Sequence, residues 1–161
     1  MSTKVKLVRI DKRLLHATVA VNWAPFVNAN FAIVVDPTYV GDSFIENVMQ
    51  LCLPKYMRVK IFNVPQLIEF VNEQTYETRN IMLIFKDLKT AREAVEMGLK
   101  VDEIQLPYPA SRMMIKKLPD YFNDTEIIDI RRIQNYNTKL YFQTAPLDAK
   151  EYGIFKRKEG E

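Results

Sequence analysis

Short apolar runs alternate along the chain with segments of helical periodicity. The apolar runs cover residues 5–10, 31–35, 58–62, 81–85, 103–106 and 139–145. Most of these runs lack polar alternation, which is typical of strands buried on both faces of a sheet. The intervening segments 18–27, 43–52, 66–73, 91–97 and 125–135 predict helices. This order predicts an α/β fold with an open, mainly parallel, doubly wound sheet and helices on both faces.

Several residues predict where the helices begin and end. Spacing typical of a capping box occurs at Ser43 with Glu46, Thr90 with Glu93 and Asn123 with Glu126. Pro65 suits the first turn of a helix, and Gly98 suits a helix end. Residues 113–122 fit either a strand or a short helix, because Pro119 interrupts them.

The length and composition predict one folded domain. The 161 residues, 48% of them hydrophobic, suffice for one core and exclude a disordered chain. We expect a single domain over residues 1–161, with a charged, frayed tail from about residue 154. No apolar run approaches the roughly 20 residues of a membrane span, and the N-terminus lacks the core of a signal peptide.

The rare residues exclude several kinds of site. Cys52 and His16 are the only cysteine and histidine, which excludes an internal disulfide, multi-cysteine zinc sites and His-pair metal motifs. None of the four glycines stands in a dinucleotide or P-loop motif. The sequence therefore predicts neither a metal nor a cofactor. The net charge of +3 comes without a concentrated basic stripe, so we expect no nucleic-acid partner.

Polar side chains follow several of the predicted strands. Asp11, Arg13 and His16 come after the first strand, Lys86 after the fourth, and the turn-rich segment 107–112 after the fifth. Ligands of open parallel sheets bind outside the carboxyl ends of the strands. We therefore expect these loops to meet at one edge of the sheet and to form the functional site.

The residues around His16 suit phosphoryl transfer. A neutral imidazole nitrogen is nucleophilic near pH 7, since its ordinary pKa is about 6.5. Arg13 could contact phosphate oxygens with its forked guanidinium. Asp11 would hold Arg13 or bond backbone N–H groups of the loop. The residues alone leave alternatives open: a structural histidine, a surface ion pair of Asp11 with Arg13, and a solvent-facing Lys86. They also leave open which ring nitrogen would react.

The segment RIDKRLLHATVAVNW (9–23) resembles the R-I-D-x-R-L-[IL]-H-G-Q-V-x-x-x-W signature of the IIB components of bacterial sugar phosphotransferase systems, mannose/fructose/sorbose family. The likeness extends over residues 29–42, 81–106 and 137–146, and so over most of the chain. The resemblance implies a cytoplasmic doubly wound α/β domain.

The resemblance also implies a reaction and partners. A protein-Nπ-phosphohistidine–sugar phosphotransferase of this kind accepts a phosphoryl group from a phosphohistidine of the IIA component and donates it to a sugar carried by the membrane components IIC and IID. The family's phosphohistidine corresponds to His16, its phosphate-binding arginine to Arg13 and its loop aspartate to Asp11. The family reacts at the ring nitrogen nearer the backbone. Such a chain would associate peripherally with the inner face of the membrane, and whether it forms a homo-oligomer stays open.

Two departures from the family pattern affect the prediction. Ala17 and Thr18 replace the glycine and glutamine after the histidine, and QLPYPASRM (105–113) replaces a glycine-rich stretch after the fifth strand. The second change concerns partner contacts or the sugar more than phosphoryl transfer itself. Both changes leave an alternative: a regulatory or binding protein on the same fold that recognises a phosphorylated partner without passing phosphate to sugar.

Overall fold

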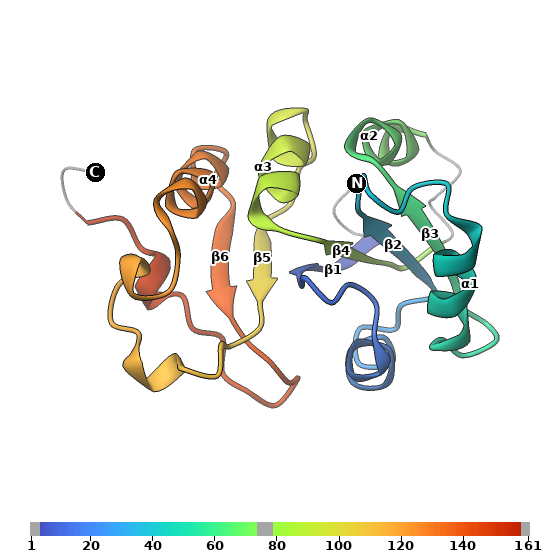
Figure 1. Ribbon diagram of the computed structural model, residues 1–161, viewed down its shortest axis with the longest axis horizontal. Helices are drawn as coiled ribbons and strands as arrows, with labels where there is room; N and C mark the ends of the chain where they lie inside the picture. The colour runs from blue at the N-terminus through green and yellow to red at the C-terminus, as the bar shows by residue number, and fades with distance from the viewer. Residues whose placement is uncertain (1–3, 74–78, 159–161) are drawn as a thin grey trace.

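A single six-stranded sheet organises the chain. The computed structural model describes residues 4–73 and 79–158 (Figure 1). The strands are β1 (Val5–Ile10), β2 (Phe31–Val35), β3 (Arg58–Phe62), β4 (Ile81–Phe85), β5 (Glu103–Leu106) and β6 (Lys139–Phe142). They are parallel to their neighbours and lie in the order β3-β2-β4-β1-β5-β6. The predicted sheet is confirmed, and every pairing within it is parallel.

Helical segments cover both faces of the sheet. The helices α2 (Val64–Asn72), α3 (Leu88–Glu96) and α4 (Asp124–Gln134) lie side by side on one face, at the top of Figure 1. The short segment η2 (Val19–Trp23) and the helix α1 (Ser43–Leu51) pack on the other. Each face has its own apolar cluster, because alternate residues of a strand point to opposite sides. No helix in the described part of the chain is long and apolar enough to cross a membrane.

Side chains cap the first turns of the helices, but two of the capping residues differ from those predicted. Asn123 caps α4 in the predicted box with Glu126. Asp42 rather than Ser43 caps α1, and Asp87 rather than Thr90 caps α3. In both helices an aspartate upstream of the predicted residue supplies the acceptor, since its carboxylate also suits the positive end of the helix dipole. Pro65 lies in the first turn of α2, and Gly98, with φ +112°, follows α3.

Two segments adopt less regular structure than predicted. The helix expected over 18–27 is reduced to the five-residue π-helical η2, closed by the Ala24 N–H donating to the Val19 carbonyl at 3.2 Å. Pro25 follows directly and has no N–H to continue the bonding. The ambiguous segment 113–122 contains two 3₁₀ turns, η4 (Arg112–Met114) and η5 (Leu118–Asp120).

The C-terminal segment differs from the expected frayed tail. Gly153–Phe155 forms the 3₁₀ turn η6, and Phe155 is 1% exposed in the core beneath α4. Arg157 donates a hydrogen bond to Asn135 Oδ1 at 2.6 Å. Residues 159–161 lie outside the described part of the chain. The apolar pair Ile154 and Phe155 explains the difference, because burying it stabilises an ordered segment despite the basic residues that follow.

The buried position of Phe155 predicts a stability effect that a frayed tail would not have. Phe155→Ala should lower the free energy of unfolding by about 3–5 kcal/mol, since it removes a buried ring and leaves a cavity. Phe44→Ala is the control, because Phe44 is 72% exposed and its loss should change stability little. Urea denaturation of both variants checks this, and equal midpoints for the two would contradict the ordered segment.

Candidate functional site

The loop after β1 turns tightly back on itself. The Asp11 N–H donates to the Phe85 carbonyl at 2.9 Å, and the Leu14 N–H donates to the Asp11 carbonyl at 2.9 Å. Leu14 has φ +58°, a left-handed backbone conformation that is strained for a leucine. The side chains of Leu14 and Leu15 are buried in the cluster on the η2 face and hold the loop in this shape. The turn returns His16 to the carboxylate of Asp11.

The Asp11 carboxylate is the centre of the site. Its side chain is 2% exposed, and both oxygens have partners. Oδ1 accepts a hydrogen bond from the Arg13 backbone N–H at 3.0 Å and lies 3.6 Å from Arg13 Nε. Oδ2 lies 3.3 Å from Arg9 Nε and 3.0 Å from His16 Nε2. The predicted trio of Asp11, Arg13 and His16 is therefore brought together.

The partners of Asp11 keep it ionised. Burial alone raises the pKa of Asp11, but the hydrogen bond with His16, the bond from the Arg13 N–H and the charge of Arg9 outweigh burial and lower it below the ordinary value. An ionised carboxylate only accepts hydrogen bonds, so the proton of a neutral His16 resides on Nε2. Nδ1 then carries the free lone pair. This arrangement agrees with the ring nitrogen that the family resemblance implies and that the residues alone left open.

Solvent reaches His16 and Arg13 to different degrees. The His16 side chain is 18% exposed and that of Arg13 is 61% exposed. His16 directly precedes the helical segment, where its carbonyl accepts from the Ala20 N–H at 3.0 Å. The imidazole is thus held by the fold, whereas the Arg13 guanidinium is largely exposed and lies close to Asp11 on its solvent side.

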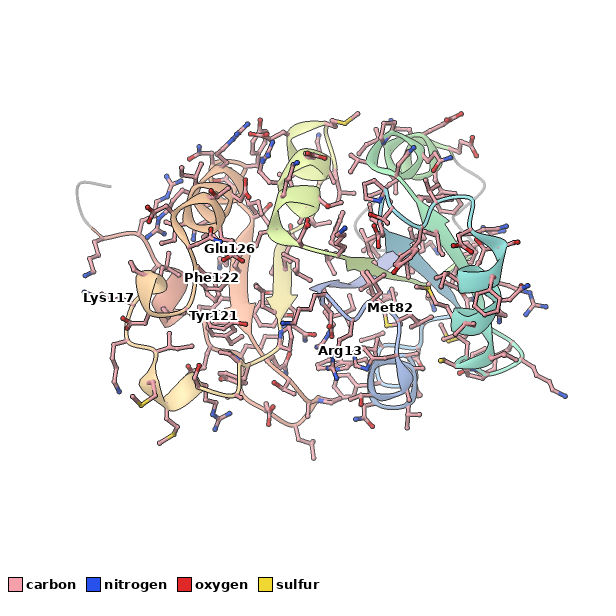
Figure 2. All side chains as sticks on the ribbon, viewed as in Figure 1. Arg13, Met82, Lys117, Tyr121, Phe122 and Glu126 are labelled. Carbon is pink, nitrogen blue, oxygen red and sulfur yellow. The ribbon has the colours of Figure 1, made fainter. Side chains whose placement is uncertain are left out.

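A cavity of about 650 Å³ lies where the carboxyl ends of three strands meet. Residues 10–13 after β1, 86–88 after β4 and 106–111 after β5 line it, together with Tyr121, Phe122 and Glu126. This confirms that the three loops share one edge. Figure 2 shows Arg13 in the loop between β1 and the short helical segment, with Tyr121 and Phe122 toward β6.

Lys86 lies on this edge but apart from the Asp11 cluster. Its Nζ is 3.2 Å from Thr38 Oγ1 and 3.7 Å from Asp36 Oδ1, in the loop after β2. The altered loop after β5 lines the cavity opposite, where the Arg112 guanidinium stacks 4.5 Å from the centre of the Tyr108 ring. Lys86 lines the cavity and Arg112 reaches it only through Tyr108, and no contact joins either residue to the Asp11 carboxylate in the described part of the chain.

Two polar residues that the sequence did not single out lie behind Asp11. Arg9 on β1 and Gln105 on β5 are 1% and 0% exposed, and an Arg9 N–H donates to Gln105 Oε1. A signal was present, because a charged residue inside an apolar strand that is covered on both faces needs a buried partner. Arg9 also stands two positions before Asp11, where strand geometry places side chains on the same side.

Residues 5–157 match the family model described as the PTS system sorbose subfamily IIB component. The chain belongs to this family. It is 26% identical over 154 residues to the N-acetylgalactosamine-specific phosphotransferase enzyme IIB component 1 of Escherichia coli (strain K12), covering 93% of this chain and 96% of that protein.

Solved structures of IIB components share the fold. The N-acetylgalactosamine-specific IIB component 1 from Escherichia coli is 26% identical with a TM-score of 0.78, over 91% of this chain and 97% of that one. The IIB domain of the sorbose permease from Klebsiella pneumoniae reaches a TM-score of 0.79 at 19% identity, covering 94% of each chain. The fold class expected for a phosphotransferase IIB component is confirmed.

The ionised state of Asp11 predicts a pH-dependent contribution to stability. Asp11→Asn should destabilise this IIB component by about 3–5 kcal/mol at neutral pH, because it leaves the buried charge of Arg9 without its counterion. The folded-state pKa of Asp11 is lowered, so its contribution to stability is full above its ordinary pKa of 3.8 and is lost as pH falls through the lower folded-state pKa. The stability difference between wild type and variant should therefore shrink below pH 3.8. Chemical denaturation across pH measures it, and a constant difference would contradict the ionised pair.

Proposed function

We propose that this IIB component is a phosphocarrier that accepts a phosphoryl group on His16 from a phosphohistidine of a IIA component. It then transfers the group to a sugar during uptake through the membrane components. The observation that carries the proposal is the 3.0 Å contact between His16 Nε2 and the ionised Asp11, which leaves the Nδ1 lone pair free.

Each of the two transfer steps forms one bond to phosphorus and breaks another. The Nδ1 lone pair of His16 attacks phosphorus, and the bond from phosphorus to the donor imidazole breaks, with its electron pair returning to the donor ring. The substituted His16 ring becomes positively charged while Nε2 keeps its proton. The negative charge of Asp11 stabilises this positive ring, as a carboxylate stabilises an imidazolium in other nucleophilic sites. In the second step a sugar hydroxyl oxygen attacks phosphorus and its proton passes to solvent, while the bond from phosphorus to Nδ1 breaks and its electron pair returns to Nδ1.

Cations at the edge favour the anionic group during transfer. Arg13 lies three residues before His16 in the same loop. Its exposed guanidinium can reach phosphoryl oxygens with two parallel N–H donors. Lys86 lines the cavity, and Arg112 stacks on Tyr108 of the cavity wall, so both contribute to a positive field there. Membership of the IIB family favours this carrier role over the regulatory alternative, and it supports IIA, IIC and IID components as partners at the inner face of the membrane.

The central test is phosphorylation of a chain that has a single histidine. A relay charged with phosphoenolpyruvate and a mannose-family IIA component should add one acid-labile phosphoryl group, read by intact mass. Nitrogen-15 NMR should place phosphorus on Nδ1. His16→Gln should fold and accept none. Phosphorylation of this variant, or no labelling of folded wild type by an active donor, would sink the proposal, and the second result would favour the regulatory alternative.

Substitutions of Arg13 and Lys86 distinguish the roles of these two cations. Arg13→Ala should slow phosphorylation by about a hundredfold, the effect typical of removing one aligned donor to a developing charge. Lys86→Ala should slow it less, because Lys86 is held by Thr38 and Asp36 rather than by the His16 loop. Quenched-flow labelling at a fixed concentration of the IIA component measures both phosphorylation rates. A larger loss for Lys86→Ala would move the principal phosphate contact to Lys86.

A further inference from the structure

We propose that Arg9 is a positioning residue that acts through Asp11 to set the tautomer of His16. The inference rests on the proposed function, since it concerns the same histidine. Arg9 lies on β1 behind the site, 1% exposed, and so has no access to a transferred group. Its influence on the reaction must therefore pass through the side chains that it contacts.

The Arg9 guanidinium joins two strands at one point. Nε lies 3.3 Å from Asp11 Oδ2, the oxygen that also contacts His16 Nε2. Nη1 donates to Gln105 Oε1 on the neighbouring strand, where Arg9 and Gln105 are register partners. The guanidinium is planar and rigid, so fixing it at both ends also fixes the direction from which it meets Asp11.

A chain of buried side chains holds Arg9 in place. Gln105 Nε2 donates to Gln143 Oε1 at 3.0 Å, and Gln143 Nε2 donates to the Asp148 carbonyl at 2.9 Å. The chain thus runs from the loop after β6, across β6 and β5, to Asp11 beside His16. Among the described residues, no buried side-chain nitrogen or oxygen lacks a hydrogen-bond partner. A fully satisfied network of this kind has one favoured arrangement, which gives Asp11 one favoured position.

The charge of Arg9 has a second effect on the same carboxylate. Its positive charge lowers the pKa of Asp11 against the opposing effect of burial. Without Arg9, Asp11 would lose a counterion and would protonate more readily. A protonated or displaced Asp11 would no longer require the His16 proton to stay on Nε2, so the Nδ1–H form would become populated. In that form Nδ1 has no free lone pair for the phosphoryl group.

The experiment compares three variants by the tautomer of the single histidine and by the rate of phosphorylation. Arg9→Met removes the charge and keeps the aliphatic stem, and Arg9→Lys keeps the charge without the fork. Arg92→Met is the matched control, because Arg92 also pairs with carboxylates, Glu96 and Asp129, between α3 and α4. Long-range ¹H–¹⁵N correlations of the imidazole report the tautomer, which a merely structural arginine would leave unchanged in a folded variant.

The expected result is specific to Arg9. Arg9→Met should populate the Nδ1–H tautomer and slow phosphorylation by about 10- to 100-fold, the range seen when groups that orient a metal-binding histidine are removed. Arg9→Lys should show a smaller rise in the Nδ1–H tautomer and a smaller loss of phosphorylation rate than Arg9→Met. Arg92→Met should resemble wild type in both measurements. A folded Arg9→Met protein with the wild-type tautomer and rate overturns the inference.

Two further outcomes are also decisive. If Arg9→Met does not fold, Arg9→Gln replaces it, because it removes the guanidinium charge while keeping a polar side chain beside Gln105. A rise in the Nδ1–H tautomer then supports the inference, and an unchanged tautomer overturns it. If wild type accepts no phosphoryl group but Arg9→Met still shifts the tautomer, the proposed function fails while the positioning role stands.

Discussion

The Asp11 carboxylate, held between Arg9 and His16, is the interaction on which the site depends. Its two oxygens receive the Arg13 backbone N–H, the Arg9 guanidinium and His16 Nε2, so it fixes the loop and the ring together. A buried carboxylate is unfavourable unless it is paired and hydrogen-bonded. Because the partners lie on the strand and on the loop, meeting this need also determines where the loop places His16.

The parallel sheet explains why the site lies where it does. The segment after β1 passes to one face, where η2 packs, whereas α3 leads from β4 to β5 on the other face. The loops at the carboxyl ends of β1, β4 and β5 are therefore drawn apart and leave a cavity between them. Strain at Leu14 is tolerated there because the buried Leu14 and Leu15 side chains hold the turn closed.

The sheet could be predicted from the sequence. So could the proximity of Asp11, Arg13 and His16, because all three belong to one short loop. The sequence placed two helix caps wrongly, since an aspartate just upstream of each predicted cap was the stronger acceptor. Arg9 and Gln105 were not predicted, because they lie within strands and their pairing depends on which strands are neighbours. The β1–β5 register, which places Gln105 beside Arg9, is known only from the three-dimensional arrangement.

A phosphocarrier needs a ring that accepts a phosphoryl group and also releases it, which limits how strongly its surroundings may bind either state. An isolated Asp11 would stabilise the charged, substituted ring but would also repel the incoming phosphoryl oxygens. Arg9 lowers that repulsion because it partly neutralises Asp11 from behind, away from solvent, where a charge–charge interaction is little screened. Arg13, on the exposed side, can follow the phosphoryl group instead. One buried and one exposed arginine thus flank one carboxylate, the buried one governing the ring and the exposed one serving the group that is passed on.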